Sequence, residues 1–417
     1  MISFMRRVRS VDIVEDRVPS LQGKTGPLVQ LTRESTSDPE LEKMAQIAGS
    51  ERDKRHLMRA IELAGQARGM TSPNPLVGAV VVKEDRVIGE GLHTAAGEPH
   101  AERAALEACT ESPTGATLYV SLEPCCHTGR TPPCTEAIVE AGIRRVVIAS
   151  DDPTPEASGR GPGILRDEGV AVEVLDGEVA DLARLLNQPF RKHARTGKPL
   201  VILKSAITLD GKVATTTGDS RWISGKASRA RAHRWRAECD AVAVGIGTVL
   251  ADDPLLTARL EAVAHQPKRV VFDSEARLPL DGRLAASLDD APVIVVCSRA
   301  APRRRVQALQ TAGITTVTVS GQNETARVKA ALSELGALEI QSLLVEGGPH
   351  LAGAFVDADE VDEMRVFVAP LIAGGRHARS AVEGQGVELI GEAIQPLSTS
   401  VEQIDDDVLI AARLKEW

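Results

Sequence analysis

The sequence predicts a two-domain α/β protein, and three observations support this fold class. The 417 residues correspond to two or three domains at roughly 150 residues per domain. From about residue 53 onward, apolar residues at helical spacing alternate with short runs of β-branched residues, a pattern typical of α/β folds. Near the middle, Thr196-Gly197-Lys198-Pro199 is rich in turn-forming residues, and we expect the boundary between the two domains there.

The composition points to a folded protein that acts on small molecules. Hydrophobic residues make up 43% of the chain and charged residues 26%, with no apolar run of membrane-spanning length. The net charge of -9 and the few aromatic residues (five Phe, three Trp and one Tyr) argue against a nucleic-acid or membrane partner.

The N-terminal region and the cysteines favour a cytoplasmic location. Residues 1–50 show little periodicity, and we expect a flexible extension there, with Met44 as an alternative start. This region has no apolar core of a signal peptide. Six cysteines in a reducing compartment are more often metal ligands or free thiols than disulfides.

The first half begins with a helix and continues with a hairpin. Apolar residues at helical spacing predict a helix over 53–68, ended by Gly69. The β-branched run at 76–82, the turn at Glu84-Asp85 and the run at 86–89 predict two paired strands. Helices then alternate with strands. The expected helices are 100–110, 133–141, 161–168 and 179–195, and the expected strands are 116–121, 144–149 and 170–174.

The second half repeats the alternation with more strands. The expected strands are 200–205, 241–245, 269–273, 292–297, 315–319, 342–345 and 364–368. The expected helices are 226–238, 302–311 and 325–335.

The most informative stretch of the chain holds a candidate zinc site. Pro99-His100-Ala101-Glu102 is followed by Pro124-Cys125-Cys126 and, after further residues, by Pro132-Pro133-Cys134. One imidazole and two thiolates leave the fourth position of a tetrahedral zinc open to water, which is the arrangement of catalytic zinc. His100 and Cys134 follow prolines at predicted helix starts, where backbone amides favour the thiolate form of cysteine.

Glu102 is the candidate proton carrier of this site. It lies two residues after His100, roughly 200° further round a helix, and so need not bind the same metal. From there it can exchange protons with a zinc-activated water, as the carboxylate of zinc deaminases does. A lone His-x-Glu is usually a solvated face, and only its combination with the two cysteines favours a metal site.

The motifs resemble the bifunctional riboflavin-biosynthesis deaminase/reductase family. The matching runs are Thr71-Ser72-Pro73-Asn74-Pro75-Leu76-Val77-Gly78, Gly97-Glu98-Pro99-His100-Ala101-Glu102, Leu122-Glu123-Pro124-Cys125 and Gly129-Arg130-Thr131-Pro132-Pro133-Cys134. The eight residues between Cys125 and Cys134 match this family, whereas most cytidine-type deaminases have a shorter loop.

The resemblance implies roles for residues of the first half. It implies a cytidine-deaminase-like three-layer α/β/α domain over 51–196, with His100, Cys125 and Cys134 as zinc ligands and Glu102 as proton shuttle. The residues implied to line the pyrimidine and ribose phosphate site are Asn74, His93, His127 and Arg130. Cys126 stands where the family usually has serine. Pro124 before Cys125 favours Cys125 as the ligand, and a swap with Cys126 stays open at this point.

The second half carries a weaker nucleotide signal of its own. Leu344 to Gly353 runs from a strand through Gly347-Gly348 into a helix start, and such bare amides can approach a phosphate. A Rossmann fingerprint is missing, because Gly245 and Gly247 have no third glycine.

For this half the resemblance implies a dihydrofolate-reductase-like α/β domain over 197–417 that binds NADPH. The implied NADPH contacts are Ala206, Trp222, Thr248, Asp252, Ser274, Gly348, Pro349, His350, Leu351, Ala352, Gly353 and Ala354. The implied substrate contacts are Lys204, Ser220, Arg236, Leu256, Arg259 and Glu346. Arginine suits the phosphate because its fork donates two parallel hydrogen bonds. No residue here shows an obvious acid/base role, and the hydride chemistry belongs to the cofactor.

The expected function is therefore bifunctional. The resemblance implies zinc-dependent deamination of a phosphorylated diaminopyrimidinone, followed by NADPH-dependent reduction of its ribosyl group to ribityl. It also implies a homo-oligomer formed through the reductase domain. Two alternatives remain: a deaminase acting on RNA, and a zinc-bearing scaffold that senses NADPH or a flavin precursor with four protein ligands on the metal. Intact motifs do not by themselves prove that both halves are active.

Overall fold

The computed structural model describes residues 39–128, 132–261, 263 and 265–417, and for 39–49 only the helical backbone is described. The helix predicted from Asp53 begins earlier, since α1 spans Pro39–Gly65. Proline fits the first turn of a helix, where its missing N–H has no partner to lose. Of the predicted flexible extension, residues 39–50 thus belong to a helix and residues 1–38 lie outside the described part.

The first sheet has five strands and follows the predicted hairpin. Its order is β2-β1-β3-β4-β5, with β1 antiparallel to β2 and β3, and with β3, β4 and β5 parallel. The strands are β1 (Gly78–Lys83), β2 (Arg86–Leu92), β3 (Thr117–Val120), β4 (Arg145–Ile148) and β5 (Ala171–Val174). Glu84 and Asp85 both have positive φ angles, as a tight two-residue hairpin turn requires.

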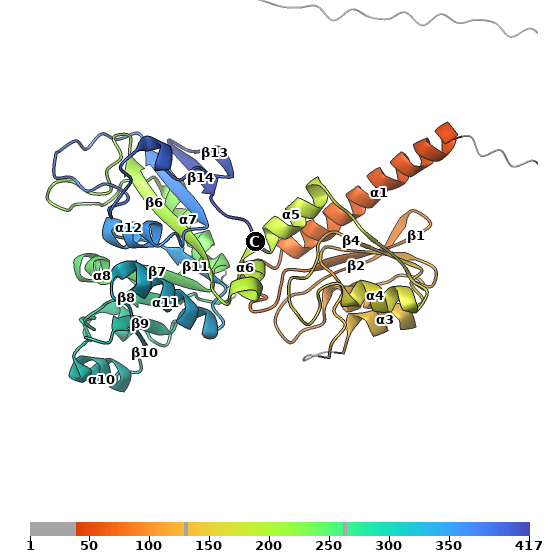
Figure 1. Ribbon diagram of the computed structural model, residues 1–417, viewed down its shortest axis with the longest axis horizontal. Helices are drawn as coiled ribbons and strands as arrows, with labels where there is room; N and C mark the ends of the chain where they lie inside the picture. Colours follow the sequence, from red (N-terminus) through yellow and green to blue (C-terminus); the bar gives the residue numbers. More distant parts are fainter. Residues whose placement is uncertain (1–38, 129–131, 262, 264) are drawn as a thin grey trace, which may run out of the picture. The chain divides into compact units, whose positions relative to one another are not determined.

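Helices cover both faces of this sheet, which gives the predicted three layers (Figure 1). The helices are α1, α2 (Ala101–Glu107), α3 (Cys134–Glu140), α4 (Arg160–Asp167) and α5 (Glu178–Leu186), and α6 (Gln188–Thr196) follows and leads into the second domain. Val81 and Leu118 pack in one core cluster with residues of α2, α3 and α4. Val80 and Tyr119 point to the opposite face and pack with residues of α1 and α5.

The second sheet has nine strands and is mixed. Its order is β10-β9-β8-β7-β11-β6-β12-β14-β13, parallel from β10 to β12 and antiparallel at β14 and β13. The strands are β6 (Leu200–Thr208), β7 (Ala241–Gly245), β8 (Lys268–Phe272), β9 (Val293–Ser298), β10 (Thr315–Val319), β11 (Ser342–Val345), β12 (Glu363–Ala369), β13 (Ser398–Ile404) and β14 (Asp407–Arg413).

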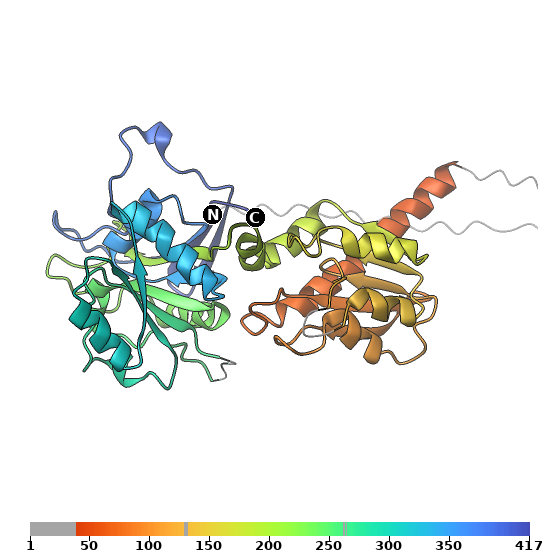
Figure 2. The ribbon, with the colours of Figure 1, turned by 60° about the horizontal axis from the view of Figure 1, so that its bottom comes forward.

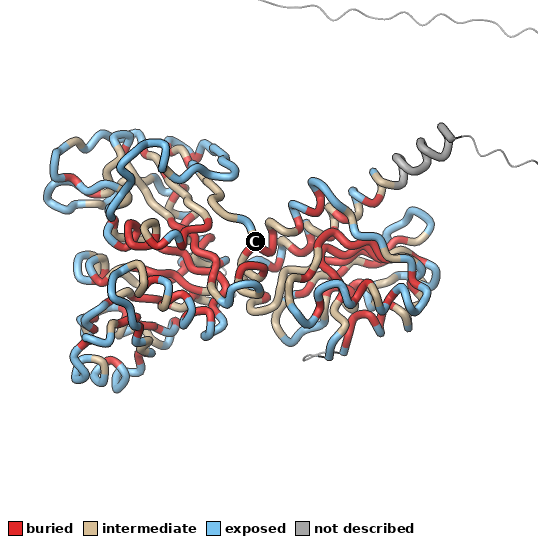
Figure 3. Tube along the Cα trace, in the orientation of Figure 1, coloured by how far each residue is buried: buried red, intermediate tan, exposed pale blue. Residues whose placement is uncertain are grey.

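Helices cover both faces of the second sheet as well (Figures 1 and 2). They are α7 (Lys226–Glu238), α8 (Ile246–Asp252), α9 (Arg283–Ala286), α10 (Arg303–Thr311), α11 (Glu324–Ala337) and α12 (Pro349–Asp357), with a 3₁₀ turn at Ile390–Glu392. Val242 and Val244 of β7 pack toward α7, while Ala241 and Ala243 pack toward α11 and α12. The central parallel strands β7, β8, β9 and β11 are buried on both faces (Figure 3), as is usual for parallel sheets.

The sequence missed some elements and merged others. The predicted helix over 179–195 is two helices, α5 and α6, which are separated at Asn187. Strands β13 and β14 were not predicted. Strand β13 is almost wholly exposed and lacks a strong apolar pattern, whereas β14 is apolar and partly buried and was simply missed. Within the described part of the chain, no helix is both long enough and apolar enough to cross a membrane.

Candidate functional site

One histidine and two cysteines converge in the first domain. Their potential ligand atoms, from His100, Cys125 and Cys134, all lie within 4.8 Å of one another. The Cys125 Sγ lies 3.4 Å from the Nδ1 of His100, and the Cys134 Sγ lies 3.3 Å from the same nitrogen. A tetrahedral zinc with normal bond lengths separates its nitrogen and sulfur ligands by roughly 3.5 Å. The three side chains therefore fit a zinc ion with one open position.

Two helix starts and the end of a strand place these ligands. His100 immediately precedes α2 in an extended conformation, and Cys134 is the first residue of α3 after Pro133. Cys125 lies beyond the end of β3, and the backbone N–H of Cys134 donates to both its carbonyl oxygen and its Sγ. The cysteine pair is thereby held before any metal binds.

The structure distinguishes the two neighbouring cysteines. Cys125 joins the cluster, whereas the thiol of Cys126 donates to the carbonyl oxygen of Glu156 at 3.7 Å. A hydrogen bond from the Cys134 thiol lowers the pKa of Cys125 to about 4. The same bond, together with burial, raises the pKa of Cys134. A bound cation would favour the thiolate form of both cysteines.

Glu102 lies beside the cluster but outside its ligand set. Its side chain is 3% exposed and forms a hydrogen bond with the Cys134 side chain. Burial and the nearby charge of Cys125 raise the pKa of Glu102 to about 7. A carboxyl group in this position can accept a proton from one side of the open metal position and release it to the other.

A histidine and an asparagine border the same site. The His93 Nδ1 lies 3.0 Å from the carbonyl oxygen of Pro99, so Nδ1 carries the proton. The other nitrogen, Nε2, then accepts from the Nδ2 of Asn74 at 3.0 Å. Burial lowers the pKa of His93, which keeps the ring neutral in this arrangement. The rings of His93 and His100 meet edge to face at 5.3 Å.

The other predicted residues of this site are less well placed. His127 is exposed and follows the cysteine pair, and Arg130 lies outside the described residues. Sequence reasoning missed Asn187, which is buried between α5 and α6. Its side chain accepts from the Leu76 N–H at 2.8 Å and donates to the Leu76 carbonyl at 2.9 Å. Asn187 thus holds the segment that carries Asn74, a role that no local motif could reveal.

The second domain contains a large cavity of about 880 Å³. It opens over the ends of β6, β7, β8, β9 and β11, as is usual for ligand sites of parallel sheets. Among its lining residues are most of the predicted contacts: Lys204, Ala206, Ser220, Trp222, Arg236, Thr248, Asp252, Arg259, Ser274, Glu346, Gly348, Pro349, His350, Leu351, Ala352 and Ala354.

Two predicted contacts do not face this cavity. Leu256 is 3% exposed and packs in the core cluster beneath α7. Gly353 lies against another segment, because a Cβ atom there would come within 2.0 Å of the carbonyl oxygen of Glu383. Its glycine is therefore explained by close packing of α12 and not by approach to a ligand.

The glycine turn after β11 forms a bare cradle. Gly347 and Gly348 have φ angles of +147° and +63°. A Cβ atom on Gly347 would lie 3.1 Å from the Thr248 Oγ1, so a side chain there would crowd Thr248 of α8. The turn leads directly into the first turn of α12, where exposed amides favour a phosphate. These features fit the pyrophosphate of a dinucleotide.

Next to the cradle, the cavity wall contains a buried ion pair. The Glu346 carboxylate accepts from the Arg236 Nε at 2.8 Å and from its Nη2 at 2.7 Å. Burial opposes ionisation, but the charge and hydrogen bonds of Arg236 outweigh it and hold the pKa of Glu346 at about 2. Burial lowers the pKa of the neighbouring Lys204, and Glu346 opposes this shift.

Sequence reasoning missed His233, which also lines this cavity. Its Nδ1 accepts from the Arg259 N–H at 3.3 Å. Burial, reinforced by the charges of Arg236 and Arg259, lowers the pKa of His233 to about 4. Its place on α7 one turn before Arg236 was the available signal, but a histidine on an arginine-rich helix is usually solvated.

Comparison with known proteins connects these two sites. Residues 50–150 match the family model described as the cytidine and deoxycytidylate deaminase zinc-binding region. Residues 199–410 match the RibD C-terminal domain. The first match contains the metal cluster and Glu102, and the second contains the cavity.

Curated relatives match over most of their length. The riboflavin biosynthesis protein RibD of Aquifex aeolicus is 42% identical over 86% of this chain and 97% of that protein. The RibD protein of Actinobacillus pleuropneumoniae is 39% identical over 86% of this chain and 94% of that protein.

Solved structures agree with the sequence relatives. The RibD of Acinetobacter baumannii matches with a TM-score of 0.77 and 39% identity, covering 88% of this chain and 99% of that one. A deaminase/reductase of Thermotoga maritima matches with a TM-score of 0.76 and 36% identity over the same shares of the two chains. The chain therefore belongs to the RibD family of bifunctional deaminase/reductase enzymes in riboflavin biosynthesis.

Proposed function

We propose that the two domains act in turn on one phosphorylated pyrimidine. The first would deaminate 2,5-diamino-6-(5-phosphoribosylamino)pyrimidin-4-one. The second would reduce the ribosyl group of 5-amino-6-(5-phosphoribosylamino)uracil to ribityl. The Thermotoga maritima relative is described as a diaminohydroxyphosphoribosylaminopyrimidine deaminase and 5-amino-6-(5-phosphoribosylamino)uracil reductase. One arrangement carries the proposal: a His/Cys/Cys cluster beside a buried glutamate, in the same chain as a cavity with a dinucleotide cradle.

In the deaminase domain, His100, Cys125 and Cys134 would hold zinc, which supplies Lewis-acid activation of a water molecule. Glu102 would serve as the proton carrier of this site, accepting a proton from water and returning it to the leaving amino group, so that ammonia would depart neutral. This role follows from its place beside the ligand set. Asn74 keeps one amide hydrogen and its carbonyl oxygen free of the His93 bond, and these can contact the pyrimidine.

In the reductase domain, NADPH supplies the hydride when bound. The Gly347-Gly348 turn and the start of α12 would hold its pyrophosphate. The ion pair of Arg236 and Glu346, with Lys204 beside it, forms a fixed polar wall for the sugar and its phosphate. Because this pair is already formed, little reorganisation is needed when substrate enters.

We place the limits of the domains at 51–196 and 197–417. Gly197 supports this boundary, because it ends α6 with a φ angle of +68°. We further propose a cytoplasmic enzyme. All six cysteines are free thiols in the structure, and the two metal-binding thiols require reducing conditions to remain available.

The proposal can be tested by following both reactions in the full-length protein. With the diaminopyrimidinone as substrate, wild-type protein should release ammonia and oxidise NADPH. Glu102→Gln should lower ammonia release by about 10²- to 10⁴-fold. It should oxidise NADPH normally when the already deaminated substrate is supplied. Glu98→Gln is the matched control, because Glu98 is exposed in the same segment.

Two results would contradict the proposal. Wild-type protein that releases no ammonia would exclude this deaminase substrate. Wild-type protein that leaves NADPH unchanged with the deaminated substrate would exclude the reductase assignment. The two arms fail independently, so each half is judged separately.

We also propose a homo-oligomer formed through the reductase domain. The outer edge of β13 is one of the two free edges of the nine-stranded sheet, and β10 forms the other. Exposed apolar residues gather on it and on the segment before it: Val387, Leu389, Ile390, Ile394, Leu397 and Val401. Several exposed large apolar side chains in one segment favour association with another surface. The double variant Ile390→Asp/Val401→Lys should shift the mass by light scattering toward the monomer, and a wild-type monomer would contradict the proposal.

A further inference from the structure

The cavity of the reductase domain has two chemically distinct ends. Lys204 on β6 and Glu346 after β11 lie at one end, with Arg236. Ser274 follows β8, Ser298 ends β9, and Arg277 lies beyond Ser274, all lining the same cavity. In the sheet, β8 and β9 lie on the opposite side of β7 and β11 from β6. The two ends are therefore separated by the Gly347-Gly348 turn after β11.

The order of the strand ends along the cavity determines how a bound dinucleotide must lie. The orientation inferred here rests on the proposed reductase function. The nicotinamide has to reach the sugar, which the polar wall at the β6 end would hold. With the pyrophosphate at the glycine turn in the middle, the adenosine half extends over the ends of β8 and β9. NADPH differs from NADH only in a phosphate on the 2′-oxygen of the adenosine ribose. A residue that recognises this phosphate must lie at the β8–β9 end.

Arg277 has the required chemistry at this end. Ala276 before it has a left-handed φ of +54°, which turns the chain at this point. The buried carboxylate of Asp273 accepts from the backbone N–H groups of Arg277 and Leu278, and its other oxygen lies 3.4 Å from the Arg277 Nε. The base of the side chain is thus anchored. Among the described residues, neither Nη atom of Arg277 has a hydrogen-bond or ion-pair partner.

Two other polar residues lie at this end of the cavity. Arg327 is less suited to bind an anion than Arg277, and Ser274 can assist Arg277. Arg327 on α11 also lines the cavity, but Glu324 lies 3.9 Å from its Nη2 and offsets its charge. Ser274 lines the cavity within three residues of Arg277 and can donate its hydroxyl to the same phosphate. A guanidinium with two free nitrogens can bind a phosphate through parallel hydrogen bonds.

We propose that Arg277 recognises the 2′-phosphate of NADPH and thereby makes the reductase domain select NADPH over NADH. The general logic is that of other NADP-binding proteins, in which an arginine accommodates this phosphate. Here the arginine is placed by a capped turn after β8 and not by a Rossmann fingerprint.

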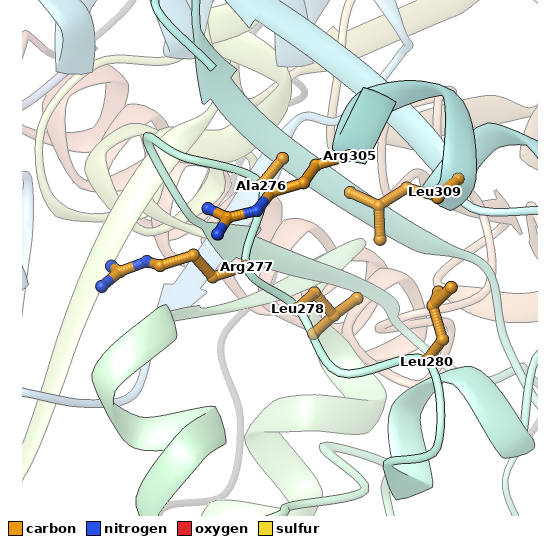
Figure 4. A pocket seen from close by; sticks show the side chains of 7 residues that line it. Ala276, Arg277, Leu278, Leu280, Arg305 and Leu309 are labelled. Carbon is orange, nitrogen blue, oxygen red and sulfur yellow. The ribbon is translucent and has the colours of Figure 1, made fainter. Parts of the chain in front are cut away.

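The neighbouring arginine offers a matched control. Arg305 and Arg277 both line a small pocket of about 230 Å³, where Arg305 lies beside Ala276 and Arg277 extends away from the leucines (Figure 4). Arg305 does not line the large cavity, and its guanidinium contacts Glu275. The two side chains are similarly exposed, at 43% for Arg277 and 48% for Arg305. Replacing either should therefore leave the fold intact.

The experiment measures nucleotide affinity directly, by calorimetric titration of the full-length protein with NADPH and with NADH. Arg277→Ala should weaken NADPH binding about 10- to 100-fold, the effect of losing hydrogen bonds to a charged group. It should change NADH affinity by less than about threefold. Arg305→Ala should retain the wild-type affinities for both nucleotides.

The outcomes separate this inference from the proposed function. If wild-type protein prefers NADPH and Arg277→Ala keeps the same preference, the role of Arg277 is excluded while the NADPH site stands. If Arg277→Ala weakens NADPH and NADH equally, Arg277 does not read the 2′-phosphate. If wild-type protein binds neither nucleotide, both the reductase assignment and this inference are wrong.

Discussion

The metal cluster of the deaminase domain and the cavity of the reductase domain are assembled in different ways. The cluster comes from one stretch of sequence between His100 and Cys134, whereas the lining of the cavity is drawn from residues between Leu203 and Val382. In the first, chemically demanding residues stand in short motifs at two helix starts. In the second, strand ends that are distant in sequence meet at one edge of a sheet.

The difference shows how each kind of chemistry is encoded. Metal ligation needs particular atoms at fixed separations, so few residue types are possible and the motif is visible. Dinucleotide binding needs bare backbone, a strand-to-helix turn and scattered polar groups, which many sequences supply. The reductase cavity is therefore harder to identify from its residues, although it is much the larger site.

The largest expected effect tests whether the metal cluster depends on Cys125 and not on its neighbour Cys126. Cys125→Ser should lose most bound zinc and with it deaminase activity, because it removes one of three ligands from the cluster. Cys126→Ser should retain both, since the thiol of Cys126 contacts the Glu156 carbonyl instead. Zinc per chain, measured by atomic emission on the purified variants, decides this comparison.

The same pair of variants also tests the independence of the two domains. Both should oxidise NADPH normally with the deaminated substrate, because the reductase cavity takes no residue from the cluster. Equal zinc loss in both variants would show that the two cysteines exchange roles.

The next effect concerns the distant pair that shapes the cavity wall. Glu346→Gln leaves the Arg236 charge buried without its partner, and removing one member of a buried ion pair costs about 3–5 kcal/mol. The free energy of unfolding of the reductase domain, from urea titration at neutral pH, should fall accordingly. Glu402→Gln, which breaks the exposed pair with Arg231, should cause no measurable change.

The pair of Arg236 and Glu346 also predicts that the stability of the fold decreases as the pH falls. The pKa of Glu346 is lowered from 4.5 to about 2 in the folded protein. Its ionisation therefore stabilises the fold fully above pH 4.5, and this contribution is lost as the pH falls toward about 2. Glu346→Gln should lack this part of the acid destabilisation. If the difference in the free energy of unfolding between wild type and Glu346→Gln stays constant down to about pH 2, this carboxylate does not cause the acid dependence.

The smallest expected effect tests a long-range contact that supports the segment carrying Asn74 in the deaminase site. Asn187→Ala removes two hydrogen bonds to the backbone of Leu76 and leaves buried groups unpaired, at a cost of about 1–3 kcal/mol. Because Leu76 follows Asn74, KM for deamination should rise while zinc content stays unchanged. Thr71→Ala, which removes one hydroxyl bond to the Asn74 carbonyl, provides a milder comparison in the same segment. An unchanged KM in Asn187→Ala would show that this segment needs no support.

Much of the fold followed from local patterns. The hairpin at Glu84-Asp85 and the alternation of helices and strands were predicted, because turn chemistry and apolar periodicity act over a few residues. The split at Asn187 was not predicted, since a single continuous helical period covers both α5 and α6. Strands β13 and β14 form by pairing at the sheet edge, and the exposed residues of β13 carry little signal. The apolar residues of β14 are partly buried, and this strand was missed from the sequence as well.

By itself, the sequence determined the chemistry of the deaminase site, because His100, Glu102, Cys125 and Cys134 stand in motifs whose spacing permits few other uses. Only the tertiary structure decided between Cys125 and Cys126, by turning one thiol toward His100 and the other toward Glu156. It also decided the reductase site, where Arg236 and Glu346 meet across a long stretch of sequence. Spacing along the chain constrains neighbours, whereas contacts between distant residues depend on how strands and helices pack.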